Sequence, residues 1–206
     1  DSSGSIGAEN FQRMIEQVAD LIFELDLDNG NDSTRGTRLG IATFSDQTEV
    51  VYQLNEYASR MSALNALDIL YKGGTTNTAS VLRYCRENMF TRQNGDRPQV
   101  ANYLVIFTDG RSNDQDETWQ EALKAREAGI RILVVGIGRM VSQFELEGMA
   151  TPPVDRNVIM IRDFRDLSGI LQRVAEGVCD NEDSCLSNPC RRSEERRVGK
   201  ECRSRW

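Results

Sequence analysis

The stretch Tyr103-Leu104-Val105-Ile106-Phe107-Thr108-Asp109-Gly110 has five apolar residues in a row and then turns polar at once. A second run, residues 130–137, is apolar except for Arg131. Short continuous runs rich in β-branched residues are typical of strands that are buried on both faces. We therefore predict two interior strands, with Asp109 at the carboxyl end of the first.

Helical and strand-like patterns alternate on both sides of these two runs. Apolar spacing predicts helices over residues 8–27, 59–70, 79–90, 117–128, 143–149 and 164–178, and strands over 39–44, 49–53 and 158–161. The polar residues 45–47 predict a hairpin turn between two of these strands. The alternation predicts one α/β domain with a Rossmann-like, open, mostly parallel sheet and helices on both faces.

Composition excludes several classes of function. The net charge of −7 argues against a nucleic-acid binder, because phosphate recognition needs clustered Lys and Arg. No run approaches the roughly 18 apolar residues that a membrane span needs. Histidine is absent, which removes the commonest general base and most zinc sites. We expect no enzyme activity, because a metal-dependent hydrolase with Asp1 as nucleophile would lack an obvious second acid or base.

Three short segments rich in side-chain oxygens fall where the predicted sheet has its loops. They are Asp-Ser-Ser-Gly-Ser at residues 1–5, Thr-Thr-Asn-Thr at 75–78 and Thr-Asp-Gly at 108–110. Sheets of this class bind ligands in the loops at the carboxyl ends of their strands. A lone Asp-x-Ser-x-Ser is more often a loop or a helix cap, so it is the three-part pattern that predicts a binding site.

The oxygen side chains in these segments are suited to a hard cation. Asp1, Ser3 and Ser5 alternate, so an extended turn can direct them toward one centre, and Asp109 leaves its strand at the same edge. Ligand sets made only of oxygen favour Mg²⁺, Mn²⁺ or Ca²⁺ over zinc or copper. Two carboxylates only just neutralise a divalent ion, so an acidic group of a partner can still displace a metal-bound water.

The same three segments carry a resemblance to a known family. Asp-x-Ser-x-Ser, the Gly-Thr-Thr-Asn-Thr loop at residues 74–78 and Thr-Asp-Gly after an apolar strand resemble the metal-ion-dependent adhesion site (MIDAS) of von Willebrand factor A (vWA) domains. Order and separations match over nearly all of residues 1–178. The resemblance implies that Ser3, Ser5 and Thr76 contact the metal directly or nearly so. It implies that Asp1 and Asp109 act directly or through water.

The resemblance also implies a function, and it is closest to matrilin-like and collagen-associated A domains. It implies an extracellular adhesion module that binds an acidic group of a matrix protein such as a collagen, or of a cell-surface protein, through Mg²⁺, or alternatively Mn²⁺ or Ca²⁺. The alternative is a structural matrix-assembly module whose partner contacts do not depend on the metal. Secretion to the extracellular matrix agrees with Cys179, Cys185 and Cys190, whose close spacing suggests disulfides.

The two ends of the chain carry further expectations. In vWA domains the first acidic ligand ends an apolar strand, whereas here Asp1 begins the sequence. We therefore expect the vWA domain, residues 1–178, to lack its first strand and to fold or bind metal less well than a chain extended upstream. Residues 179–191 resemble a linker and the truncated start of an EGF-like module. Residues 192–206 resemble the translation of a sequencing adapter and are expected to be non-native.

Four residues near these motifs have simpler explanations than a second site. Thr78 is expected to cap a helix rather than to bind metal. Asp114 and Asp116 are explained by the dipole of the helix that follows them. Cys85, at an apolar helical position, is expected to be a buried and inert thiol.

Overall fold

In the part of the chain that the structure describes, the main sheet is formed by three parallel strands. The structure, a computed structural model, describes residues 1–28, 36–56 and 59–169. The strand order is β3 (Asn102–Thr108), β4 (Ile130–Ile137) and β5 (Val158–Ile161), all parallel. A separate antiparallel hairpin of β1 (Ile41–Phe44) and β2 (Thr48–Tyr52) confirms the predicted turn between them. The predicted α/β architecture with a mostly parallel sheet is confirmed.

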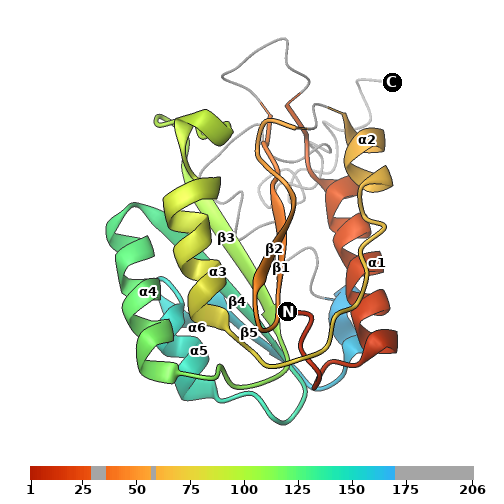
Figure 1. The fold of residues 1–206 in the computed structure, drawn as a ribbon, viewed down its shortest axis with the longest axis vertical. Coiled ribbons are helices and arrows are strands. Elements are labelled where there is room, and N and C mark those ends of the chain that lie inside the picture. The colour runs from red at the N-terminus through yellow and green to blue at the C-terminus, as the bar shows by residue number, and fades with distance from the viewer. Residues whose placement is uncertain (29–35, 57–58, 170–206) are drawn as a thin grey trace, which may run out of the picture.

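Helices cover both faces of this sheet (Figure 1). On one side lie α1 (Ala8–Glu24) and α2 (Arg60–Asn65), which contact each other. On the other side lie α3 (Thr78–Tyr84), α4 (Gln115–Glu127) and α5 (Gln143–Met149). A short α6 (Val154–Asn157) leads directly into β5. The chain thus crosses from one face to the other as a doubly covered sheet requires.

Strand β4 carries side chains of both hydrophobic cores. Leu133, Val135 and Ile137 pack into the cluster that contains α1, whereas Ile132 and Val134 pack into the cluster of α3, α4 and α5. Successive side chains of a strand point to opposite faces, so a run without polar residues supplies both cores at once. Burying one such side chain is worth about 1.5–3 kcal/mol, so this strand contributes strongly to stability.

The observed helices differ from the predicted ones in several segments. The segment 59–70 is helical only to Asn65, because residues beyond it turn sharply and leave Leu70 mostly exposed. The segment 79–90 changes after Tyr84 into a π-helical turn, Cys85–Met89, in which Phe90 N donates to Cys85 O (2.9 Å). The segment 164–178 begins as a 3₁₀ helix, Phe164–Gly169. A 3₁₀ turn, Arg92–Asn94, follows the π-helical turn. Residues 170–178, the EGF-like start and the adapter-like tail lie outside the described residues.

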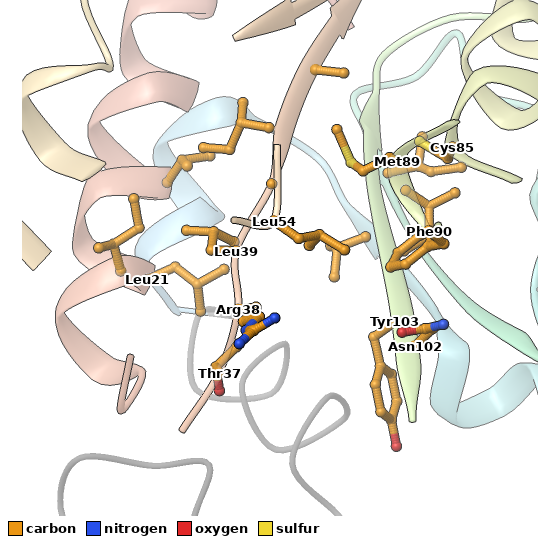
Figure 2. A pocket seen from close by; sticks show the side chains of 18 of the residues that line it. Leu21, Thr37, Arg38, Leu39, Leu54, Cys85, Met89, Phe90, Asn102 and Tyr103 are labelled. Atoms are coloured by element: carbon orange, nitrogen blue, oxygen red, sulfur yellow. The ribbon is translucent and has the colours of Figure 1, made fainter. Parts of the chain in front are cut away.

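An apolar groove separates the hairpin from the parallel sheet (Figure 2). Among the described residues, β1 pairs only with β2 and β3 only with β4, so two strand edges face the groove. Figure 2 shows Leu21 and Leu39 on one side and Met89 and Phe90 on the other. The groove encloses a cavity of about 250 Å³. Its two open strand edges and its apolar lining are therefore those of a position for a strand.

The first two residues of the chain occupy one end of this groove. The amino nitrogen of Asp1 donates to Phe107 O in β3 (3.0 Å), and Ser2 N donates to Phe44 O in β1 (2.8 Å). Consecutive residues of a central strand donate alternately to its two neighbours. Residues 1 and 2 therefore join the hairpin to the parallel sheet.

Within the described part of the chain, none of the helices is long and apolar enough to cross a membrane.

Candidate metal centre

The three oxygen-rich segments meet at one edge of the sheets, as the sequence predicted. Residues 1–5 continue from the groove between β1 and β3, and Gly4 N donates to Gly74 O (2.8 Å). The loop before α3 is held to the end of β1 by a hydrogen bond from Asn77 N to Ser45 O (2.9 Å). Asp109 directly follows β3. Backbone hydrogen bonds therefore place the segments side by side.

Side-chain oxygens from the three segments form one cluster. Ser3 Oγ and Ser5 Oγ are 3.1 Å apart, and Ser5 Oγ donates to Asp109 Oδ1 (2.7 Å). A Cβ placed on Gly110 would lie 3.3 Å from Ser5 Oγ and 3.9 Å from Thr76 Oγ1, so Thr76 belongs to the same cluster. Ser3, Thr76 and Asp109 are buried, whereas Ser5 is exposed and marks the solvent side.

The carboxylate of Asp1 is fixed behind this cluster. Its Oδ1 accepts from Ser3 N (2.8 Å) and its Oδ2 accepts from Thr108 Oγ1 (2.7 Å). The side chain is buried, and so is the amino group, whose pKa burial lowers to about 5 against the opposing charge of Asp109. The Asp1 carboxylate thus links the backbone of Ser3 to the end of β3.

Asp109 is a carboxylate with little water around it. It is 9% exposed, and burial raises the pKa of its carboxyl group above the ordinary value. The hydrogen bond from Ser5 acts in the opposite direction. A backbone hydrogen bond and the charge of the amino terminus also act in that direction, but burial outweighs all three effects. A cation would supply further compensating charge to this carboxylate.

The donor set and its spacing fit a small divalent cation. Neighbouring ligands of an octahedral Mg²⁺ at 2.0–2.1 Å lie about 2.9 Å apart. The Ser3–Ser5 and Ser5–Asp109 oxygen distances of 3.1 and 2.7 Å fall on either side of that value. Among the described residues no group of three or more His, Cys, Asp or Glu gathers as a metal site. The centre instead has two carboxylates supplemented by hydroxyls. The apolar groove lies elsewhere, and of the five candidate ligands only Asp1 lines it.

Two residues that position the cluster were missed by sequence analysis. Asp46 Oδ1 accepts from Thr75 N (2.8 Å) and from Thr75 Oγ1 (2.6 Å). Asn113 Oδ1 accepts from Thr76 N (2.9 Å), and Asn113 N donates to Thr76 O (2.8 Å). Both residues lie in turns, where Asp and Asn are common for purely local reasons. Only the meeting of distant loops reveals that they hold Thr76 in place.

The simpler explanations for nearby residues are partly confirmed. Cys85 is 2% exposed, and burial raises the pKa of its thiol to about 12, as expected for an inert group. Asp114 caps α4 by accepting from Glu117 N (2.9 Å). The expectation for Thr78 is wrong, because Asn77 is the cap and accepts from Ser80 N (3.1 Å), leaving Thr78 as the first helical residue.

Comparisons with known proteins agree with this fold. A family model described as von Willebrand factor type A domain matches residues 1–173. Matrilin-2 of Mus musculus is 31% identical over 87% of this chain, and the collagen alpha-5(VI) chain of Homo sapiens is 34% identical over 87%. These matches span 18% and 7% of the two relatives, so the chain corresponds to a small part of each.

A solved structure extends the comparison to three dimensions. Proximal thread matrix protein 1 from the mussel byssus, described with a zinc-occupied MIDAS motif, superimposes with a TM-score of 0.78 at 28% identity. The match covers 87% of this chain and 46% of that one. The family model, the two relatives and this structure agree over the same region. The chain belongs to the von Willebrand factor type A domain family.

Proposed function

We propose that this domain is an extracellular adhesion module that binds an acidic group of a matrix protein such as a collagen, or of a cell-surface protein, through a divalent cation. The proposed ligands are Asp1, Ser3, Ser5, Thr76 and Asp109, and the proposed cation is Mg²⁺, with Mn²⁺ or Ca²⁺ as alternatives. The observation that carries the proposal is the chain of oxygens from Ser3 through Ser5 to Asp109, at 3.1 and 2.7 Å.

Each residue has a physical part in this proposal. Buried Asp109 supplies negative charge at the end of β3, and Ser3 and Ser5 supply neutral oxygens from the opposite segment. Asn113 fixes the backbone of Thr76. Within the described residues, the hydroxyl of Thr76 forms no hydrogen bond, so it is available to a cation. A bound cation would supply a coordination position open to an acidic side chain of a partner. Binding of this kind involves no chemical turnover.

The comparisons support the extracellular part of the proposal. The relatives include a matrilin and a collagen chain, and the solved structure is named a matrix protein. That protein is described with zinc in its MIDAS motif, which supports a metal at the corresponding edge here. The chain corresponds to a fraction of each relative, so partner identity and secretion remain part of the proposal.

A structural matrix-assembly module is the second candidate. Phe144, at 68% exposed, and Met61, at 67%, are large apolar side chains on helices, as contacts on helix faces require. In that case the cation would only brace the loops, and binding to matrix proteins would survive its removal.

Titration calorimetry with Mg²⁺, Mn²⁺ and Ca²⁺, followed by solid-phase binding to purified collagens, tests the proposal. We expect heat on cation addition, and collagen binding that is lost with a chelator and with Asp109→Ala. Asp116→Ala is the matched control, because it removes the same charge from an exposed residue of the following helix. Collagen binding that persists in both cases supports the structural module. Absence of heat with all three cations, from a folded protein, refutes the metal site.

A further inference from the structure

A recess lies over the exposed side of the candidate metal centre. It is lined by Ser5, Gly74, Thr76, Gly110, Arg111, Arg139, Met140 and Val141. Two hydroxyls of the proposed ligand set therefore form one part of the same surface that carries two arginines. A partner group that reaches these hydroxyls also comes close to the guanidinium groups.

The register of the sheet explains why the two arginines share this recess. Thr108 at the end of β3 is paired with Gly136 near the end of β4, in parallel. Arg111 follows β3 by three residues and Arg139 follows β4 by two. Parallel neighbours end at the same edge, so both loops rise beside the candidate metal centre.

The arginines are available to a partner. Both are exposed, and among the described residues neither forms an ion pair, although ten other ion pairs are present there. The chain as a whole carries a net charge of −7. The two arginines make this recess locally positive on a protein that is negative overall. A planar guanidinium binds carboxylates in a fixed fork geometry, which favours an acidic group over a neutral one.

An apolar surface adjoins the arginines. Met140 is 75% exposed and Val141 lines the recess beside it. Exposed methionine adapts to partner side chains of different shape. The recess therefore combines three features: hydroxyls of the proposed metal centre, unpaired positive charge and an adaptable apolar rim.

We propose that this recess recognises a protein segment with two acidic side chains and a neighbouring apolar one. One carboxylate faces the hydroxyls of Ser5 and Thr76, the second pairs with Arg111 and Arg139, and the apolar side chain packs on Met140. This inference rests on the proposed function for the first carboxylate only. A sulfated glycan is a poorer occupant, because its repeated negative charges need an extended basic surface and the remainder of this chain is acidic.

Fluorescence polarisation with paired peptides tests the inference on the whole chain in Mg²⁺. The probes are labelled Gly-Leu-Glu-Gly-Glu-Gly, the same peptide with Gln in place of the second Glu, and a heparin hexasaccharide. We expect the doubly acidic peptide to bind up to about fivefold more tightly than its Gln counterpart, with the preference falling as salt is raised. The double variant Arg111→Ala with Arg139→Ala should bind the two peptides equally and should still give a heat of Mg²⁺ binding.

The matched control is Arg156→Ala, which removes an exposed arginine of α6, before β5 and hence at the opposite edge of the sheet. It should keep the preference for the doubly acidic peptide. Equal binding of both peptides by the wild type, or tighter binding of heparin than of either peptide, overturns the inference. Chelator-insensitive binding that still needs the arginines refutes the proposed function and leaves the arginine contact intact.

Discussion

Filling the apolar groove between β1 and β3 should stabilise the domain strongly. The change is a six-residue apolar segment, Val-Ile-Val-Leu-Val-Val, joined directly ahead of Asp1. Six residues match the part of β3 that lines the groove, from Asn102 to Phe107. The backbone of Asp1 already lies in line with such a segment, because its nitrogen donates to Phe107 O (3.0 Å).

The expected gain follows from the size of the cavity. Void volume in a protein core costs about 24 cal/mol per Å³, so a cavity of about 250 Å³ corresponds to about 6 kcal/mol when it is filled. For a chain of this size, 1 kcal/mol shifts the melting temperature by roughly 2–4 °C, so the expected rise is roughly 12–24 °C. The extension also turns the buried amino group of Asp1 into a peptide nitrogen. It therefore removes the cost of burying a group that is mostly charged in the unfolded chain at neutral pH and whose pKa burial lowers to about 5.

Thermal and urea unfolding, followed by circular dichroism, measure this gain. The control carries Gly-Ser-Gly-Ser-Gly-Ser at the same position, which adds the same length without apolar side chains. The reasoning is refuted if the apolar extension melts within 2 °C of the control or of the unextended chain. A gain in stability accompanied by tighter Mg²⁺ binding would link the groove to the candidate metal centre through Asp1.

Three further predictions concern single residues. Gly74→Ala should weaken Mg²⁺ binding, measured by calorimetry, more than Gly129→Ala does. Both glycines have positive φ (88° and 85°), but only at Gly74 would a Cβ meet Asp46 Oδ2, at 2.7 Å. Equal effects of the two substitutions would contradict this prediction. Iodoacetamide at pH 8 should modify Cys85 only after unfolding, because burial raises the pKa of its thiol to about 12. Alkylated Cys85 detected by mass spectrometry in the folded protein would disprove this prediction. Burial alone would raise the pKa of Glu121, but hydrogen bonds and charges from neighbouring Lys and Arg outweigh it and lower the pKa from 4.5 to about 2. The stabilisation by these partners is therefore present above pH 4.5 and is lost as pH falls toward 2. Glu121→Gln should lower the free energy of unfolding in urea by about 2 kcal/mol at neutral pH, allowing for the partly exposed partners, and should have almost no effect near pH 2. A cost that does not change with pH would exclude this account.

The strands and the parallel sheet followed from the sequence because their pattern is local. The run 130–137 is apolar on both faces, and the structure buries its two faces in two separate cores. Helix ends were less accurate. The π-helical turn after Tyr84 keeps the apolar spacing close to helical, so periodicity did not distinguish it from an α-helix.

The candidate metal centre was predictable as a set of residues but not as an arrangement. Asp1, Ser3, Ser5, Thr76 and Asp109 were recognised from spacing and from family resemblance, and the structure brings these segments together. Their role in binding metal stays a prediction.

What the sequence by itself determined is the list of elements, the two-faced burial of the central strand and the identity of the oxygen-bearing side chains. What only the tertiary structure decided is which distant groups meet. Asp46 and Asn113 brace Thr75 and Thr76, and Arg111 and Arg139 share a recess, across separations that no local pattern records. The physical reason is that a side chain's own type and spacing set its secondary structure and burial. Its partners are set by the register of parallel strands, which brings together the loops that follow them.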